Sequence, residues 1–253
     1  MDDVERENLR LQKKLTRLEA NVREMEEMHD ATSKLLSTLT RELEEERVRS
    51  HALLLNILPQ PIIDRLEAGE TNIADRFPEI TVLFSDLVGF TAISSELDAP
   101  VVVAALNRLF SRFDELCERT GVEKIKTIGD AYLAVGGLPG TRVDHVAAVA
   151  ELALAMADVV REPHDGPEWR VRIGIHTGPA VAGVIGSRKF AYDVWGDTVN
   201  VASRLESSSE PNRIHVSGAV AYALGERYRF ASRGAVPLKG KGETETFFLL
   251  DAN

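Results

Sequence analysis

The first 58 residues carry a helical repeat of apolar positions. They contain neither glycine nor proline, and apolar residues recur three and four positions apart. Written in heptads, one seam position holds Val4, Leu11, Leu18, Met25, Thr32 and Leu39, and the other holds Asn8, Leu15, Val22, His29, Leu36 and Leu43. A sustained heptad pattern with charged residues between the seams is typical of a coiled coil. Residues 1–58 are therefore predicted to form one long helix that pairs in parallel with a second copy.

The repeat is interrupted and then changes phase. Three seam residues are polar, and such residues can set register and strand number: Asn8, His29 and Thr32. The next seam positions would be Glu46 and Ser50, whereas apolar residues resume in a shifted phase from Val48. A phase change alters the local winding of a coiled coil. Two interpretations stay open: pairing ends there, or the segment transmits a signal by rotating or splaying the residues C-terminal to it.

A short linker separates this helix from the rest of the chain. Pro59 and Pro61 end the long helix, because proline lacks the N–H that a helix interior needs. Apolar residues at 62, 63 and 66 predict a short amphipathic helix that stops at Gly69. We expect residues 59–77 to form this linker, ahead of a globular domain at 78–253.

The remaining residues alternate between strand and helix patterns. Strands are predicted near 79–86, 122–128, 131–136, 169–176, 180–185, 190–194, 213–216 and 244–250, and helices near 100–119, 144–161, 197–208 and 217–224. The first part reads strand, helix, hairpin, helix, strand. This βαββαβ order predicts an α/β (α+β) sandwich with helices packed on a sheet.

Composition and charge restrict the class of protein. The chain is 44% hydrophobic and 28% charged, as in globular domains. A net charge of −10 argues against a nucleic-acid partner. The single cysteine, Cys117, cannot form an internal disulfide, and no apolar run approaches the roughly 18 residues of a membrane span. We expect a cytoplasmic location, either for the whole protein or for the cytoplasmic part of a membrane protein with an upstream sensor.

Two aspartates follow apolar strands. In "FSDLVGFT" the first strand ends at Asp86, and in "KIKTIGDAY" Asp130 lies in a Gly-Asp turn between two apolar runs, which is a hairpin signal. Taken singly, Asp86 could cap the next segment and Asp130 could be only a turn residue. If their strands are neighbours, both carboxylates project from one edge and repel unless a cation lies between them. Mg²⁺ prefers one or two carboxylates together with substrate phosphates.

The turn after Asp86 supports a phosphate site. Its successive backbone N–H groups could face an anion, as in a phosphate nest: Val88, Gly89, Phe90 and Thr91. Carboxylates beside such a turn favour a metal–triphosphate site over a carboxylate acid/base pair.

A third stretch, "YDVWGDTVNVASR", runs from a strand into a helix. Asp197 or Thr198 is suited to cap that helix. Asn200 and Arg204 are four residues apart and share one helical face. A solvated arginine would be the ordinary interpretation, but an Asn–Arg pair on a face that begins beside a cleft favours polyphosphate binding.

These motifs, together with "LKGKGE", resemble the catalytic domain of class III nucleotidyl cyclases over about residues 78–250. The resemblance implies a ferredoxin-like βαββαβ cyclase domain with extra C-terminal α/β elements. It also implies conversion of ATP or GTP to a 3′,5′-cyclic nucleotide and pyrophosphate, with active sites formed between two catalytic domains.

The resemblance assigns roles position by position. Asp86 and Asp130 match the metal-binding aspartates, with the carbonyl of Leu87 as a further ligand, for two divalent cations (Mg²⁺ or Mn²⁺) per site. Four further positions match residues that act on the nucleoside: Lys126 and Asp193 read the base, Asn200 orients the ribose and Arg204 stabilises the transition state. Two more match contacts to the terminal phosphates: Arg188 in "GSRKF" and Lys239 in "LKGKGE".

The base-reading pair indicates the substrate. Lysine only donates hydrogen bonds and a carboxylate only accepts them. Adenine presents an acceptor at N1 and a donor at N6, so Lys126 with Asp193 complements adenine, whereas a guanine-selective site would want an acidic residue at 126. The sequence predicts an adenylyl cyclase acting on ATP. A guanylyl cyclase and a catalytically silent nucleotide-binding dimerisation module are the alternatives.

The position of Lys126 relative to Asp130 bears on the assembly. The two residues are four positions apart and would nominally lie on the same face of a strand. At about 3.3 Å per residue they would be about 13 Å from each other, so one site could use both. The resemblance instead combines Asp86 and Asp130 of one chain with the base-reading and catalytic residues of the other. Because this chain carries both sets, it implies a two-fold homodimer with two equivalent sites.

Overall fold

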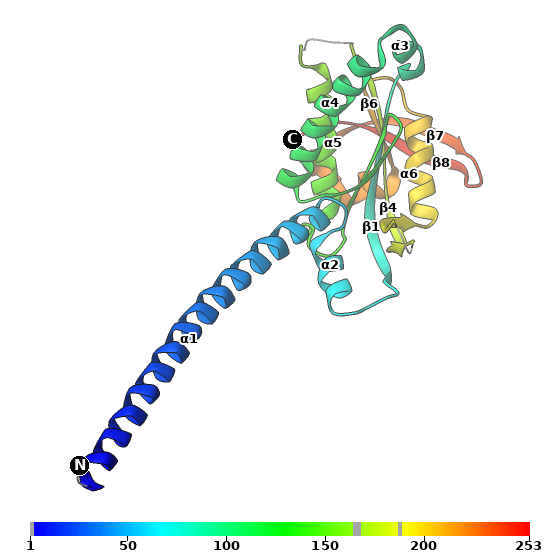
Figure 1. Ribbon diagram of the computed structural model, residues 1–253. Helices are drawn as coiled ribbons and strands as arrows, with labels where there is room; N and C mark the ends of the chain where they lie inside the picture. Colours follow the sequence, from blue (N-terminus) through cyan, green and yellow to red (C-terminus); the bar gives the residue numbers. More distant parts are fainter. Residues whose placement is uncertain (1–2, 164–167, 187–188) are drawn as a thin grey trace. The chain divides into compact units, whose positions relative to one another are not determined.

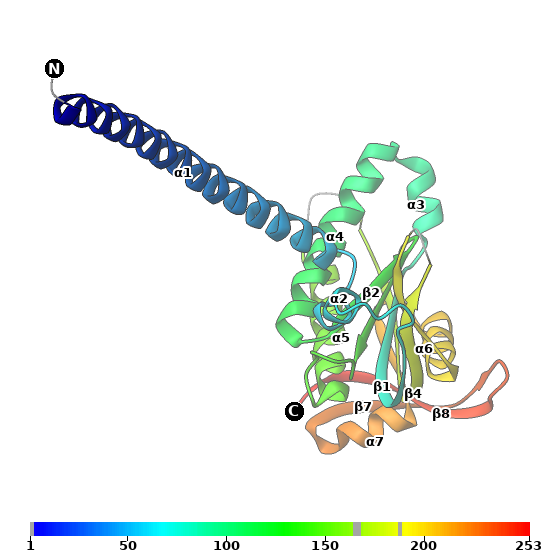
Figure 2. The ribbon, with the colours of Figure 1, turned by 60° about the horizontal axis from the view of Figure 1, so that its bottom comes forward.

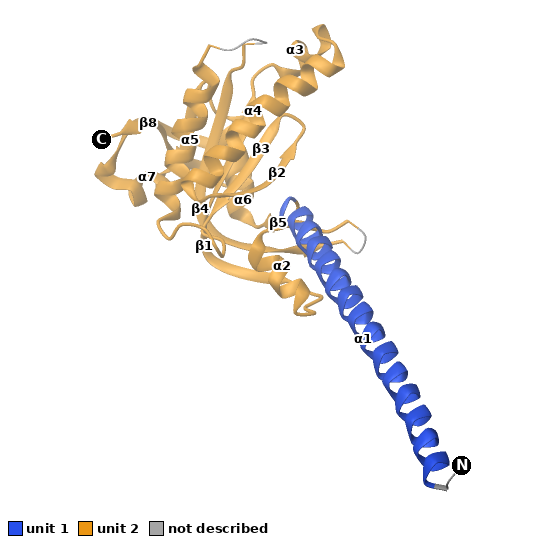
Figure 3. Cartoon of the chain, turned by 60° about the vertical axis from the view of Figure 1, so that its left-hand side comes forward, with its two compact units in different colours: residues 1–56 blue, residues 57–253 orange. Residues whose placement is uncertain are grey.

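The computed structural model describes residues 3–163, 168–186 and 189–253, and the chain divides into two compact units. The first unit, Met1–Asn56, contains the helix α1 (Asp3–Leu55), and the second unit, Ile57–Asn253, contains the sheet and the other helices. Figure 1 labels these elements, and Figure 3 distinguishes the two units by colour.

Helix α1 confirms the long helix predicted from the heptad pattern. Its 53 residues contain no helix breaker and would extend about 80 Å at 1.5 Å per residue. The seam side chains face solvent: Leu11 is 56% exposed and Leu39 is 50% exposed. In the described part of the chain, no helix is long and apolar enough to cross a membrane.

The second unit is built on one mixed sheet. Its strands are β1 (Ala74–Leu87), β2 (Glu123–Ile128), β3 (Ala131–Gly136), β4 (Val171–Ile185), β5 (Ala191–Trp195), β6 (Arg213–Ser217), β7 (Tyr228–Leu238) and β8 (Gly242–Ala252). The strand order is β2-β3-β1-β4-β6-β8-β7, with β5 paired to β4 beside this path. The β4–β6 pair is parallel, and the other pairs are antiparallel. The predicted α/β fold with a βαββαβ core and C-terminal additions is confirmed.

Helices cover both faces of the sheet. They are α2 (Gln60–Glu67), α3 (Phe90–Glu96), α4 (Ala99–Thr120), α5 (His145–Arg161), α6 (Asp197–Ser207) and α7 (Gly218–Leu224), which a 3₁₀ turn at Gly225–Arg227 follows. Figure 2 shows α4 and α5 on one side of the sheet and α6 on the other. Val82 and Leu83 are neighbours on β1 but belong to opposite apolar clusters, because successive strand residues point to opposite faces.

Three strands differ from the prediction. β1 begins at Ala74, inside the predicted linker of residues 59–77. β4 is one strand from Val171 to Ile185, where the sequence predicts two, because Gly178 and Pro179 resemble a turn. The register between β1 and β4 shifts at this point, with Ile80 opposite Gly178 and Phe77 opposite Ala180. Proline is tolerated at such an irregularity because no ladder hydrogen bond is required of it. β7 is absent from the prediction: it ends the strand order beside β8, where Pro237 is likewise tolerated.

A glycine brings α6 close to the sheet. A Cβ placed on Gly174 of β4 would lie 2.1 Å from the backbone nitrogen of Glu206 and 2.4 Å from the carbonyl oxygen of Ala202. Any larger residue at 174 would therefore push α6 away from β4. This contact sets the position of the helix that carries Asn200 and Arg204.

Candidate active site

Asp86 lies at the end of β1, beside β4. The register pairs Asp86 with Arg172, and the Arg172 Nη2 atom donates to Asp86 Oδ1 at 3.1 Å. Helix α3 begins after Gly89, whose φ of 74° suits glycine, and no side chain caps it. Asp86 is therefore not a helix cap, and its carboxylate faces a guanidinium.

Asp130 reaches the same edge of the sheet. Gly129 and Asp130 form the two-residue turn between β2 and β3, as predicted. Since Ser85 pairs with Tyr132, Asp130 comes beside the end of β1. Burial raises the pKa of the Asp86 carboxyl, the negative charge of Asp130 raises it further, and Arg172 opposes both. The structure thus brings the two carboxylates close enough to repel each other.

This carboxylate pair fits divalent cations. Carboxylate oxygens suit Mg²⁺ and Mn²⁺, and Mg²⁺ commonly uses one or two carboxylates while phosphates and water complete its shell. Over residues 3–163, 168–186 and 189–253, no group of three or more His, Cys, Asp or Glu side chains is arranged to hold a metal. The protein would supply only part of the coordination, and a bound triphosphate would supply much of the rest. Leu87, the third predicted ligand, is buried beside Val171 of β4.

Sequence reasoning missed Arg172. Besides Asp86, its guanidinium donates to Glu206 on α6, from Nε to Oε1 at 3.0 Å. Glu206 is only 7% exposed, and burial, followed by the charge of Asp86, raises the pKa of its carboxyl. Arg172 therefore links the carboxylate edge to the helix that carries Arg204. A lone arginine in the otherwise apolar run "VRIGI" was the available signal.

Lys126 and Asp193 form an ion pair between β2 and β5. The Asp193 side chain is 14% exposed and that of Lys126 is 41% exposed. The pair depends on a β-bulge: Lys124 pairs with Ala134 and Lys126 pairs with Leu133, so β2 has one extra residue, Ile125. The bulge turns Lys126 to the opposite face from Lys124, although only one residue separates them.

Asn200 and Arg204 lie on α6, as predicted, but the predicted caps are wrong. The N-cap residue is Gly196, with no side-chain hydrogen bond. Asp197 instead pairs with Lys241 at 2.5 Å, and the Thr198 hydroxyl donates to the Pro179 carbonyl at 2.6 Å. Both contacts hold the start of α6 to neighbouring segments.

The predicted phosphate contacts fall into three groups. Lys239 lies in the turn between β7 and β8, and a Cβ on its neighbour Gly240 would lie 3.9 Å from the Arg204 Nη1 atom, so this turn reaches Arg204. The Val88 N–H donates to the Arg170 carbonyl at 2.7 Å and is not available to an anion, which leaves Gly89, Phe90 and Thr91. Arg188 lies outside the described residues.

Known proteins of similar sequence identify the family. Residues 73–251 match the family described as the adenylate and guanylate cyclase catalytic domain, so the chain belongs to the class III nucleotidyl cyclases. An adenylate cyclase of Mycobacterium tuberculosis is 46% identical over 82% of this chain and 48% of its own length. The human atrial natriuretic peptide receptor 2 is 43% identical over 89% of this chain and 22% of its own. The chain thus spans about half the length of the first relative and less of the second.

The solved structures agree on the fold. The guanylate cyclase domain of RhGC from Catenaria anguillulae, in complex with GTP, superimposes with a TM-score of 0.69 at 34% identity. The match covers 71% of this chain and all of that domain. The family and the cyclase fold expected from the four motifs are confirmed.

Proposed function

We propose that the chain is an adenylyl cyclase that converts ATP to 3′,5′-cyclic AMP and pyrophosphate. The ion pair between Lys126 and Asp193 carries this proposal. The relatives of this chain include proteins named as adenylate cyclase and as guanylate cyclase. The choice between adenine and guanine therefore rests on the chemistry of this ion pair. An ammonium can donate to N1 of adenine, and a carboxylate can accept from its N6 amino group. Guanine presents the opposite pattern, which leaves both side chains mismatched, and a mismatched polar site can discriminate by about 10⁴ or more.

The reaction joins the ribose 3′-oxygen to the α-phosphorus and breaks the bond from that phosphorus to the pyrophosphate oxygen. The 3′-hydroxyl gives up its proton, and pyrophosphate takes the electron pair of the broken bond. Divalent cations held by Asp86 and Asp130 would supply Lewis acidity to both oxygens. Asn200 orients the ribose, and the Arg204 guanidinium, beside the turn that carries Lys239, stabilises the charge that develops on the phosphoryl oxygens.

Arg172 neutralises part of the charge of Asp86 at the end of β1. Its guanidinium can form fork-shaped hydrogen bonds to phosphate as well as to carboxylate. Arrival of a metal–triphosphate would give Asp86 a new cationic partner and give Arg172 a new anionic one. Arg172 therefore extends the set of residues proposed to contact the phosphates.

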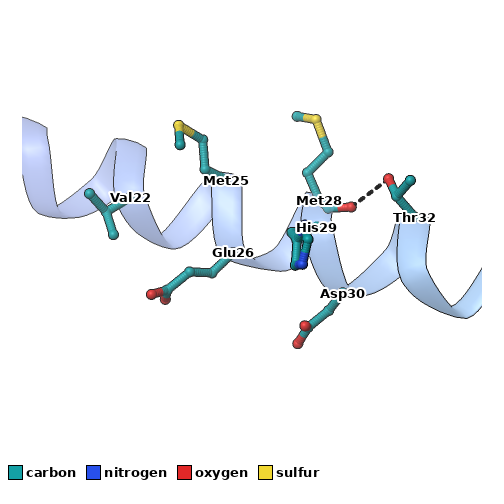
Figure 4. Close-up of a pocket in the computed structure, with 7 residues that line it drawn as sticks. All are labelled: Val22, Met25, Glu26, Met28, His29, Asp30 and Thr32. Carbon is teal, nitrogen blue, oxygen red and sulfur yellow. Dashed lines mark hydrogen bonds between the residues drawn. The ribbon is translucent and has the colours of Figure 1, made fainter.

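We also propose a parallel homodimer, paired through α1 and through the catalytic domains. In an in-register parallel pair, Lys14 would face Glu19 of the second copy and Glu42 would face Arg47, while none of the flanking heptad positions brings like charges together. Figure 4 shows part of the seam, a shallow depression lined by Val22, Met25, Glu26, Met28, His29, Asp30 and Thr32. The Thr32 hydroxyl donates to the Met28 carbonyl at 2.8 Å, so this polar seam residue is satisfied within its own helix.

The purified chain tests the proposed activity directly. With Mg²⁺ or Mn²⁺, we expect cyclic AMP from ATP and a much lower rate of cyclic GMP formation from GTP. The Lys126→Ala variant should lose this preference. A faster reaction with GTP would make the chain a guanylyl cyclase, and no product from either nucleotide would make it a silent dimerisation module.

Mixing two inactive variants tests the shared sites. Asp86→Ala removes a metal ligand, and Arg204→Ala removes the cation at the transition state. In an equimolar mixture, half of the dimers would be mixed and each would hold one intact site of two, so we expect about a quarter of wild-type activity. Activity no higher than that of the separate variants would refute sites built from two chains.

A further inference from the structure

Helix α4 contacts both strands of the β2–β3 hairpin through one carboxylate. The Lys124 Nζ atom of β2 lies 2.7 Å from a carboxylate oxygen of Asp114, and the Tyr132 hydroxyl of β3 donates to Asp114 Oδ1 at 2.7 Å. The Lys124 ammonium also lies 5.2 Å from the centre of the Tyr132 ring. Asp114 therefore contacts both strands of the hairpin, at Lys124 and at Tyr132.

Because of the bulge, the contact from Lys124 to Asp114 lies on the opposite face of β2 from Lys126, the proposed base-reading residue. Lys124 points to the face covered by α4, and, one extra residue later, Lys126 points to the opposite face and pairs with Asp193. Ile125, the extra residue, packs into the apolar cluster on the Lys126 face. The contact from Asp114 to Lys124 opposes a shift of β2 that would absorb the bulge, and a slip by one residue sends side chains to the wrong face.

The second contact, from Tyr132 to Asp114, lies close in sequence to Asp130. Tyr132 is fully buried and lies two residues after Asp130. Its hydroxyl, enclosed in the core, donates to Asp114. The Cys117 Sγ atom, 3.3 Å from the same oxygen, completes the surroundings of the hydroxyl. The strand that follows the Asp130 turn is therefore held to α4 two residues after Asp130, at Tyr132.

We propose that Asp114 is a positioning residue. By holding Lys124 and Tyr132, it positions Lys126 for contact with the base and Asp130 for metal binding beside Asp86. The proposal rests on the proposed function, and it adds a residue that contacts neither nucleotide nor metal. If the sites are shared, Lys126 and Asp130 of one chain serve different sites. Asp114 then acts on base recognition in one site and on metal binding in the other.

The expected signature differs from that of a stabilising contact. The side chains of Asp114 and Lys124 are 42% and 36% exposed, and exposed ion pairs contribute little to stability. A displacement of about 1 Å at a reacting group, by contrast, can cost about 10²-fold in rate. Loss of Asp114 also removes an acceptor from the buried Tyr132 hydroxyl, so some loss of stability is expected, but a stabilising contact alone would not change nucleotide selectivity or the metal requirement.

The test compares Asp114→Ala with Glu151→Gln in the full-length chain. Glu151 pairs with Arg142, a residue outside the hairpin, at 2.6 Å and with similar exposure. For Asp114→Ala we expect the ratio of kcat/KM for ATP to that for GTP to fall about tenfold or more, and the Mn²⁺ concentration for half-maximal activity to rise. For Glu151→Gln both should stay within about twofold of wild type. Asp114→Asn keeps an acceptor for Tyr132 and loses the charge for Lys124, so it should lower the ratio but leave the Mn²⁺ requirement closer to wild type.

Amide hydrogen exchange supplies a readout that needs no catalysis. Exchange in residues 124–132 should accelerate in Asp114→Ala and stay unchanged in Glu151→Gln. An unchanged nucleotide ratio with unchanged exchange would overturn the proposal. If the wild-type chain forms neither cyclic nucleotide, the proposed function fails, and the exchange comparison alone then shows whether Asp114 holds the hairpin. Should Asp114→Ala not fold, Asp114→Asn gives the same comparison.

Discussion

The two units of this chain use the same apolar residue types in opposite ways. In α1, Leu11 and Leu39 are half exposed, whereas in the sheet domain Leu83 and Phe113 have no exposed surface. The domain buries its apolar side chains between its own elements, but a single helix has nothing to bury its seam against. The difference indicates that the domain can be stable within one chain, whereas the seam of α1 would be buried only by the pairing proposed above.

The largest effect should come from a change in the domain that leaves its packing intact. Arg204→Ala removes the guanidinium proposed to stabilise the phosphoryl charge, and arginines in related phosphoryl transfer contribute about 10³-fold or more in kcat. We expect kcat for ATP to fall by that order while KM changes little, as measured by steady-state kinetics. Arg229→Ala, which breaks an exposed pair with Asp251, is the control. A raised KM at unchanged kcat would reassign Arg204 to substrate binding.

The next effect contrasts leucines from the two units. Leu83→Ala leaves a cavity in the core and should lower the free energy of unfolding of the domain by about 2–5 kcal/mol. Leu36→Ala changes a side chain that is 59% exposed and should leave that free energy unchanged. Denaturant unfolding of both variants measures the difference. An equal loss from both would mean that the helix and the domain unfold as one cooperative unit.

Acid should destabilise the domain through His215. Its ring is fully buried beside Phe248, and burial, with the Arg233 charge as a smaller cause, lowers its pKa to about 4. Between pH 6.5 and about 4, His215 is protonated in the unfolded chain but neutral in the folded chain. The free energy of unfolding therefore falls by roughly 3 kcal/mol as the pH falls through this range. Unfolding of wild type and His215→Gln across this range measures it. The variant should have a flatter profile, and parallel profiles would exclude His215 as the cause.

The smallest effect should appear in assembly. Leu15→Lys places a charge on the α1 seam, where it would face its copy in a parallel pair. We expect the protein concentration for half-maximal activity to rise about tenfold, which corresponds to about 1.4 kcal/mol in association, with unfolding of the domain unchanged. Activity against dilution, alongside sedimentation, tests this. Arg17→Lys, a change outside the seam, should have no effect, and identical dilution curves for both variants would count against pairing through α1.

Periodicity was sufficient to predict α1 and most strands, because apolar spacing reports directly which face is buried. It failed where tertiary pairing overrode a local signal. Gly178 and Pro179 suggest a turn, yet β1 and β4 stay paired on either side of them. The sequence suggests an open turn after Asp86, but residues 90–96 form α3, with Gly89 in a left-handed conformation before it.

The candidate site residues predicted from the sequence are those that a motif marks, and residues that matter only through tertiary contacts were not predicted. Asp86 and Asp130 follow strand ends, and both lie at one sheet edge. Arg172 and Asp114 have no such mark, because each matters through a partner far away in sequence: Glu206 for the first and Tyr132 for the second. Nothing in the strand pattern alone could show that one residue of β2 is unmatched in its ladder.

That unmatched residue makes the number of residues in β2 as important as their identities. If Ile125 instead paired with Leu133 in a regular ladder, Lys126 would come opposite Tyr132 and turn toward α4, away from Asp193, without changing a single functional side chain. By the same argument, a lysine introduced at the position of Lys126 in a related strand without the bulge would point to the face covered by α4. Exchange of nucleotide preference between cyclases of this family should therefore be designed by matching strand length first and side chains second.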